Sequence, residues 1–135
     1  MFESPQLESV LDIDQFLDFF VEDAVVHGVV EIFGQQGPMV GHEQLRGFFG
    51  AAFENLDWLI QLNSITDVSL SPDGMAANTS LAVVETAERT GADQILMIGR
   101  YDDKLTLTDR GWKFVERRLT VHKFTTFTLT DPRPG

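Results

Sequence analysis

One tyrosine and one nearby carboxylate are the side chains of this sequence whose types and spacing could transfer a proton. Tyr101 is the single tyrosine of the chain, and Asp103 follows two residues later. Because side chains alternate between the two faces of a strand, both are expected on the same face. A phenol can orient a carbonyl oxygen or act as an acid, and a buried carboxylate with a raised pKa can exchange a proton. The ordinary alternatives are an amphipathic wall residue for Tyr101 and a solvated strand end for Asp103.

Arg117 is the candidate that could bind an anion. If it points into a cavity, it can anchor a carboxylate or an oxygen that gains charge during a reaction, and the alternative is an ion pair with an acidic residue. The three histidines lie on separate predicted elements without ligand spacing, and the chain has no cysteine. We therefore expect no metal site and no thiol chemistry, and we predict no cofactor. His27 is predicted to face outward or toward an interface.

Four long C-terminal strands must position these side chains. From Trp58 onward the hydrophobic pattern changes to a period of two, and short sequences rich in Gly and Asp interrupt it. Consecutive hairpins of this kind predict an antiparallel meander. Strands of about 14 residues twist and coil, so one face of the sheet is expected to be concave. The predicted strands cover residues 58–70, 75–88, 94–108 and 112–127.

Helical spacing in the first half of the chain predicts the elements that cover the concave face. A helix from near His42 carries a stripe of Leu45, Phe48, Phe49, Ala52, Phe53 and Leu56, and only the concave face can bury that stripe. This predicts an α+β domain with a pocket, which Phe48, Phe49 and Phe53 either line or fill. The β-branched run 24–33 predicts a strand covered on both faces. A shorter helix, capped by Asp12 or Asp14, is predicted from the spacing of Ile13, Phe16, Leu17, Phe20 and Val21.

Length, composition and charge limit the classes of function. The 135 residues match one domain, with a core at about 12–127 and a loose tail at 131–135. A net charge of -11 would repel phosphate backbones and anionic lipid, so no nucleic-acid partner is expected. The sequence has no long apolar stretch that would predict a membrane span. The absence of cysteine suits a reducing compartment, and a cytoplasmic location is the expectation.

A family resemblance rests on four segments that occur in this order: FVEDAVV at 20–26, GHEQLRGFF at 41–49, IGRYDDKL at 98–105 and GWKFVERR at 111–118. The chain resembles the SnoaL-like branch of the nuclear transport factor 2-like superfamily over roughly residues 12–124. The resemblance implies a cone-shaped α+β fold, commonly dimeric, with a pocket between sheet and helices. It also implies proton abstraction or elimination in an apolar cavity, because most enzymes of this superfamily work in that way.

The resemblance further implies where functional residues should lie, and several expected ones are missing. The ketosteroid isomerase base would fall at Gly28 and its oxyanion acid at Gly99, while Gln61 stands near the place of the dehydratase histidine. Neither glycine nor Gln61 can exchange a proton. The pocket wall of the family still carries over, and with Gln61 the implied ligand-binding residues are Val26, Val84, Met97, Tyr101, Arg117 and Val121.

The leading hypothesis is that the pocket binds a small, mostly apolar molecule, cyclic or aromatic, whose oxygen Tyr101 and Arg117 orient. Any catalysis would be isomerisation, dehydration or cyclisation by proton transfer, with Tyr101 or Asp103 as acid or base. The alternatives are a ligand carrier or sensor without chemistry, and a structural small subunit of an oxygenase-type complex. A homodimer joined through the exposed face of the sheet is also expected, because that face carries much apolar area.

Overall fold

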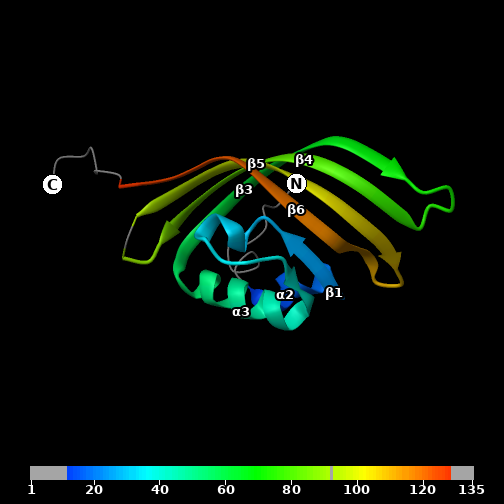
Figure 1. Cartoon of the computed structure of the whole chain (residues 1–135), viewed down its shortest axis with the longest axis horizontal. Helices are drawn as coiled ribbons and strands as arrows, with labels where there is room; N and C mark the ends of the chain where they lie inside the picture. The colour runs from blue at the N-terminus through cyan, green and yellow to red at the C-terminus, as the bar shows by residue number, and fades with distance from the viewer. Residues whose placement is uncertain (1–11, 92, 129–135) are drawn as a thin grey trace, which may run out of the picture.

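The computed structural model describes residues 12–91 and 93–128. These residues form one curved sheet of six strands with helices below its concave face (Figure 1). The predicted C-terminal tail at 131–135 lies outside these residues. The elements in chain order are α2 (Ile13–Asp18), β1 (Phe20–His27), the 3₁₀ helix η1 (Val30–Phe33), β2 (Met39–Val40), α3 (Gly41–Glu54), β3 (Leu56–Leu70), β4 (Ala76–Arg89), β5 (Gln94–Thr108) and β6 (Gly111–Phe127).

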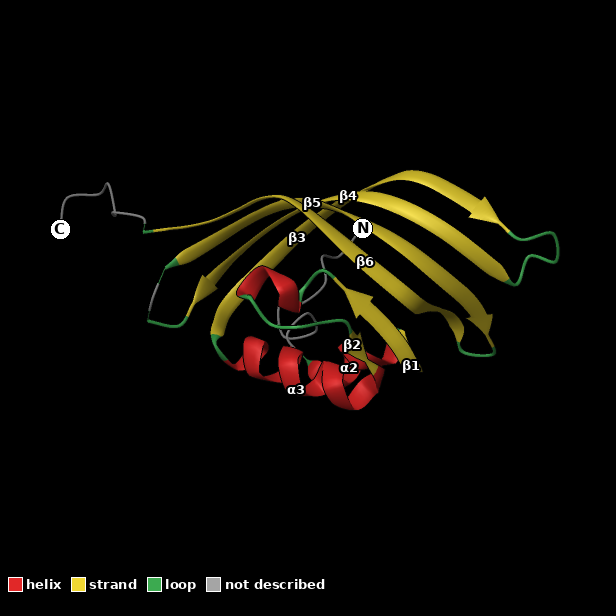
Figure 2. Ribbon diagram, in the orientation of Figure 1, coloured by secondary structure: helices red, strands yellow, loops and turns green. Residues whose placement is uncertain are grey.

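The sheet is mixed, with strand order β2-β1-β6-β5-β4-β3. Strands β3 to β6 form the predicted antiparallel meander, and their bounds differ from the predicted ones by no more than a couple of residues. β1 joins them in parallel beside β6, which the sequence pattern did not predict. Figure 2 shows the long strands arching over the two α-helices, which lie together on one side of the sheet. The α+β fold class predicted from the sequence is therefore confirmed.

The N-terminal elements differ from the predicted ones. α2 ends at Asp18, and Phe20 already pairs with Phe114 of β6, so Phe20 and Val21 belong to a strand although their spacing is helical. The predicted strand at 24–33 ends at His27, and its second half forms η1. Tertiary pairing with β6 overrides the local pattern at the first site, and a turn at Gly28 breaks the strand at the second.

The conformation and contacts of Gly28 explain that turn. Its φ is +91°, in the region that favours glycine, and a Cβ atom placed there would lie 2.0 Å from the carbonyl oxygen of Leu119 on β6. No other residue can pass so close to the neighbouring backbone. The strand therefore ends here, and the chain turns beneath the sheet.

The hydrophobic core has two clusters that share partly buried neighbours. α3 buries Leu45 completely against β1, as its predicted apolar stripe requires. The second cluster lies on the meander and includes Tyr101. Val29 packs against both clusters. The first cluster contains Leu17, Phe20, Ala24, Val26, Val30, Met39 and Leu45, and the second contains Val83, Met97, Tyr101 and Leu119.

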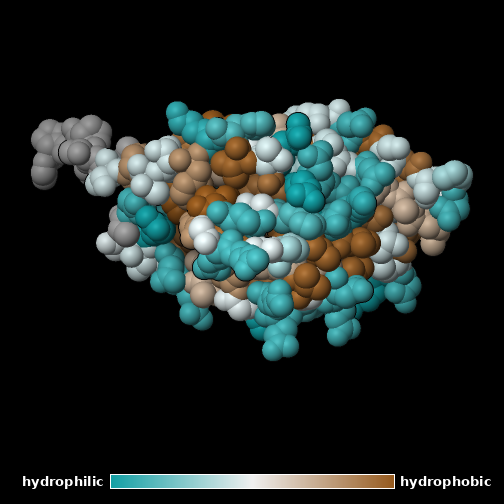
Figure 3. Space-filling model, in the orientation of Figure 1, coloured by the Kyte–Doolittle hydropathy of each residue, from teal (hydrophilic) through white to brown (hydrophobic). Residues whose placement is uncertain are grey.

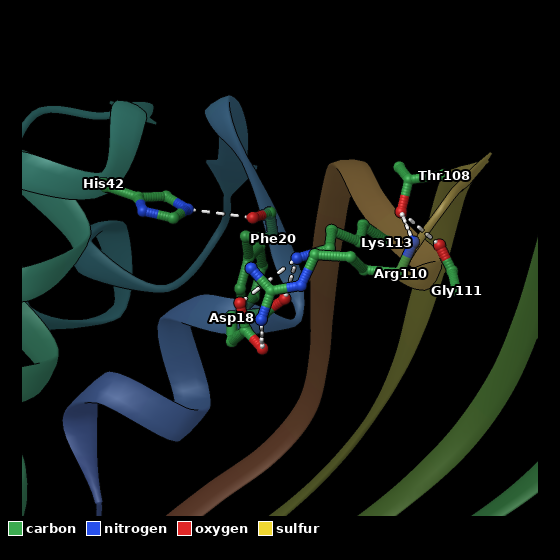
Figure 4. Close-up of polar contacts among 7 residues, drawn as sticks. All are labelled: Asp18, Phe20, His42, Thr108, Arg110, Gly111 and Lys113. Atoms are coloured by element: carbon green, nitrogen blue, oxygen red, sulfur yellow. Dashed lines mark hydrogen bonds and ion pairs between the residues drawn. The ribbon is translucent and has the colours of Figure 1, made fainter.

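Polar contacts tie the helices to the sheet at the start of β1 (Figure 4). Lys113 Nζ on β6 donates to the backbone oxygen of Asp18 at 2.8 Å and to its carboxylate at 3.2 Å. His42 Nε2, at the start of α3, donates to the carbonyl oxygen of Phe20 at 2.8 Å. The ion pairs with Lys113 and Arg110 hold the pKa of Asp18 below its usual value. These contacts fix the end of α2 and the first turn of α3 against the edge of the cavity.

No helix in residues 12–91 and 93–128 combines the length and the apolar character needed to cross a membrane.

Candidate functional site

A cavity of about 1070 Å³ lies between the concave face of the sheet and the layer formed by α2, η1 and α3. Among the described residues, its wall includes every phenylalanine except Phe127. Phe48, Phe49 and Phe53 belong to this wall, where Phe48 and Phe49 meet edge to face with ring centres 5.1 Å apart. In the described part of the chain these rings line the cavity and do not fill it. In Figure 3 apolar side chains reach the surface along the junction between the sheet and the helix layer.

A chain of hydrogen bonds from polar side chains runs across the sheet floor of this cavity. Asn63 Nδ2 donates to Gln61 Oε1 at 3.3 Å, and Gln61 Nε2 donates to Glu85 Oε1 at 2.9 Å. Gln61 and Glu85 are register partners on β3 and β4, so the sheet itself places them side by side. The amide therefore orients the carboxyl group within an apolar enclosure.

Among the described residues, Glu85 is the acidic residue that lines the cavity, and it was not among the sites predicted from the sequence. Burial raises its pKa above the usual value, while the hydrogen bond from Gln61 and the positive charge of Arg117 lower it part of the way back. Its second carboxylate oxygen, Oε2, accepts no hydrogen bond from the described residues, and no buried side-chain oxygen among them lacks a partner. Oε2 is therefore open to the cavity. A carboxyl group whose pKa is raised in this way can take up and release a proton at a higher pH than an ordinary carboxyl group.

Tyr101 is where the sequence predicted it, on the concave face of β5 and within the cavity wall. It is 8% exposed, and burial raises its pKa to about 12, helped by the negative charges of Glu85 and Asp103 and opposed by Arg117 and the nearby Gln61 amide. The phenol therefore keeps its proton at physiological pH. Its hydroxyl donates no hydrogen bond to the described residues, and no buried side-chain oxygen among them lacks a partner. The hydroxyl is therefore open to the cavity and can act as a donor there.

Arg117 and Asp103 form a buried, two-pronged ion pair beside this tyrosine. Arg117 Nε and Nη2 donate to the two oxygens of Asp103 at 2.9 and 3.3 Å, and the two residues are register partners. The guanidinium lies over the Tyr101 ring, 3.6 Å from its centre, and 4.4 Å from the centre of Phe114. Burial raises the pKa of Asp103, and Arg117 opposes that rise. With both oxygens held, Asp103 positions Arg117 and is not placed to exchange a proton with a ligand.

The predicted wall residues divide into two groups. Val26 and Met97 are buried and line the cavity, together with Gln61, Tyr101 and Arg117. Val84 does not, because strand alternation turns it to the convex face, where it is 39% exposed. The predicted wall position on β4 was therefore wrong by one residue, because Glu85, the neighbour of Val84, lies on the cavity side.

Val121 is the second predicted wall residue that does not line the cavity. It packs against the Tyr101 cluster outside the wall. The pairing of β5 with β6 shifts between the pairs Gly99–Val121 and Ile98–Lys123, which marks a β-bulge. A bulge inserts one residue and reverses the alternation beyond it. Phe124, after the bulge, lines the cavity for this reason.

The described residues contain no group of three or more His, Asp or Glu side chains that could hold a metal ion. His27 instead contacts Glu116 at 3.3 Å, and His122 is exposed in β6.

A pH-dependent stability is expected from Glu85. Its pKa in the folded protein is raised above the ordinary value of 4.5, so the stability that the protonated form contributes is complete below that pH. It is lost as the pH rises through the folded-state pKa. In urea denaturation, the free energy of unfolding of the wild type, minus that of Glu85→Gln, should therefore fall as the pH rises above about 4.5 and through the raised pKa of Glu85. A difference that stays constant with pH would contradict the raised pKa.

The architecture and the position of the cavity together define the class of the protein. A strongly curved sheet with helices against its concave face, and a cavity floored by strand side chains, is the fold of nuclear transport factor 2-like proteins. The model of the SnoaL-like domain family matches residues 11–118, and the chain belongs to this family. No curated protein matches the chain.

Solved structures of similar proteins have the same fold. A proposed aromatic ring hydroxylase from Novosphingobium aromaticivorans is 25% identical, with 90% of this chain and 85% of that chain covered and a TM-score of 0.71. A proposed scytalone dehydratase from the same organism is 19% identical, with coverage of 93% and 81% and a TM-score of 0.75. The dehydrochlorinase LinA-type3 from Novosphingobium barchaimii is 18% identical, with coverage of 94% and 88% and a TM-score of 0.66. Because one fold hosts many activities, the function must be argued from the site.

Proposed function

We propose that the cavity binds a small, mostly apolar molecule, cyclic or aromatic, that carries a carbonyl or hydroxyl oxygen. We further propose cofactor-free isomerisation, dehydration or cyclisation of that molecule by proton transfer. One observation carries both proposals: a carboxylate oxygen of Glu85 and the hydroxyl of Tyr101 are open to the same phenylalanine-lined cavity. The cavity supplies apolar contact area, and these two groups supply one acceptor and one donor.

The roles of the two groups follow from their protonation states. The ionised Glu85 takes a proton from the carbon next to a ring carbonyl, and the electron pair of the broken C–H bond moves toward the carbonyl oxygen. Tyr101 keeps its own proton and donates a hydrogen bond to that oxygen as it becomes an enolate. The protonated Glu85 then returns the proton to another carbon, or to a leaving hydroxyl group. Proteins of similar fold include a proposed dehydratase and a dehydrochlorinase, which supports this class of reaction.

The exchange of ring-ketone hydrogens for deuterium tests this function without knowledge of the natural substrate. We expect the wild type to accelerate exchange at the acidic carbon of a bicyclic ketone such as 2-tetralone in D₂O, followed by NMR. Tyr101→Phe should slow that catalysed exchange by about 100-fold, because one donor to the developing oxyanion is lost. Binding of naphthalene, which has no oxygen, should be unchanged and serves as the control. An undiminished exchange rate in Tyr101→Phe would remove the tyrosine from the mechanism.

A ligand carrier without chemistry is the alternative that a specific observation favours. The positions of the expected isomerase base and acid are Gly28 and Gly99, and a Cβ at Gly99 would lie 2.5 Å from the backbone oxygen of Thr120. Neither position can hold the base or acid of those enzymes. Tight binding of the bicyclic ketone with no acceleration of its exchange would favour the carrier over the enzyme.

Self-association through the convex face is also proposed, on the evidence of its exposed apolar side chains. Ile60, Leu62, Val84 and Ile98 occupy adjacent positions on that face and are 36–66% exposed. Packing against a second sheet would remove this area from water. Size-exclusion chromatography separates a homodimer from a subunit of an oxygenase-type complex, because only the latter elutes with other proteins from a cell extract.

A further inference from the structure

Among the described residues of the cavity wall, the charged side chains are Glu85, Arg89 and Arg117, and Tyr101 is neutral. Each arginine is held by its own aspartate. Arg89 Nε and Nη2 donate to the two oxygens of Asp93, both at 2.7 Å, and Arg117 makes the corresponding pair with Asp103. Both positive charges in the described wall are therefore already paired, while the direct hydrogen-bond partner of Glu85 is the neutral amide of Gln61.

The two ion pairs differ in burial, and this decides which one acts on a ligand. The side chain of Arg89 is 42% exposed, so water screens its charge. The side chain of Arg117 is 14% exposed and that of Asp103 is 0% exposed. Interactions between charges are stronger at such a low local dielectric, and a two-pronged pair is the strongest geometry for them. The charge of Arg117 is therefore cancelled inside the cavity wall, over the ring of the tyrosine that is proposed to hold the ligand.

We propose that Asp103 determines the charge specificity of the cavity: by neutralising Arg117 it admits uncharged rings that bear a carbonyl or hydroxyl oxygen and excludes carboxylates of the same size. This inference rests on the proposed ligand-binding function and names its substrate class. An anionic ligand would find no uncompensated cation in the described wall and would meet Glu85 when that group is ionised. The net charge of -11 adds a long-range repulsion of the same sign.

Two probes of equal ring size measure this specificity by calorimetry at neutral pH: 2-acetylnaphthalene, which is neutral, and 2-naphthoate, which is anionic. The wild type should bind the ketone at least about tenfold more tightly. Asp103→Asn keeps the size and an acceptor oxygen for Arg117 but frees its positive charge, so the ratio of affinities should shift toward the carboxylate by at least about tenfold. Asp102→Asn is the matched control, because it removes the same charge one residue away on the convex face, where Asp102 binds Ser80 and Arg100. The ratio of the two affinities in Asp102→Asn should equal that of the wild type.

The possible outcomes distinguish a failure of the charge specificity from a failure of the proposed ligand-binding function. Equal affinity of the wild type for both probes overturns the charge specificity, and this holds even where Asp103→Asn does not fold. An unchanged ratio in a folded Asp103→Asn, or an equal shift in Asp102→Asn, also overturns the role of Asp103. Binding of neither probe to the wild type overturns the proposed ligand-binding function, and the charge specificity falls with it.

Discussion

Replacing Glu85 with glutamine is expected to slow the catalysed deuterium exchange of 2-tetralone by about 100-fold or more. General acid–base groups contribute about 10²- to 10⁴-fold to enzymatic rates, and an amide cannot accept the proton. The glutamine side chain has nearly the same size as that of Glu85 and can still pair with Gln61, so the cavity should keep its shape. Affinity for the ketone should therefore change little, and the loss should appear in the rate of exchange.

A matched variant on the same strand controls for the change in charge. Glu88 lies three residues beyond Glu85 on the opposite face of β4 and accepts a hydrogen bond from Gln94 at 3.0 Å. Glu88→Gln should exchange deuterium at the wild-type rate. If Glu85→Gln retains the wild-type rate as well, Glu85 is not the base, and the carrier alternative gains support.

Gly28→Ala is expected to cause the largest loss of stability, about 3 kcal/mol or more in the free energy of unfolding. Two costs add: a positive φ of +91° for a residue with a side chain, and a Cβ only 2.0 Å from the carbonyl oxygen of Leu119. Because that oxygen belongs to the backbone of β6, the clash can be relieved only by moving a strand. Urea denaturation measures the loss.

Gly34→Ala separates the two costs. Gly34 also has a positive φ, +77°, but a Cβ there would meet no atom within 4 Å. We therefore expect Gly34→Ala to lose only the backbone term of about 1–2 kcal/mol. Equal losses in the two variants would show that the contact with Leu119 costs nothing, which would contradict the geometry of the β1 turn.

The contact at Gly28 also bears on where a base can lie. The family resemblance implied the isomerase base at this position, and the close approach of β6 leaves no room there for any side chain. The cavity instead presents a carboxylate from β4, on the opposite side of the meander. The proposed proton transfer therefore depends on Glu85, and the proposed ligand would lie differently from one whose base is on β1.

The sequence predicted the meander well because its four strands carry a clear period of two and are separated by turn residues. Tyr101, Met97, Arg117 and Val26 reached the cavity as expected, since each lies on a strand whose facing follows from that period. α3 was predictable for the same reason, because its phenylalanine stripe must be buried. These elements depend on local pattern, which a single sequence carries in full.

The features that could not be predicted from the sequence depend on the pairing of strands that are far apart in the chain. Val84 and Glu85 are adjacent, and only the register of β4 against its neighbours determines which one faces the cavity. The β-bulge beyond Val121 reverses the facing of β6, and no residue there marks it. For Arg117 the sequence leaves open an anion anchor or an ion-pair partner, and the choice depends on Asp103, a cross-strand neighbour. A lone acidic residue in the apolar run 81–87 was the one signal that could have pointed to Glu85.

A crystal structure of the protein with bound 2-naphthol is the most direct test of the central claim, because this phenol resembles the enolate of 2-tetralone. We predict that its rings lie among the cavity phenylalanines. Its oxygen should lie within hydrogen-bonding distance, about 3 Å, of both the Tyr101 hydroxyl and a carboxylate oxygen of Glu85. A naphthol oxygen that turns toward α3, away from both groups, or a ligand bound outside the cavity, would contradict the account.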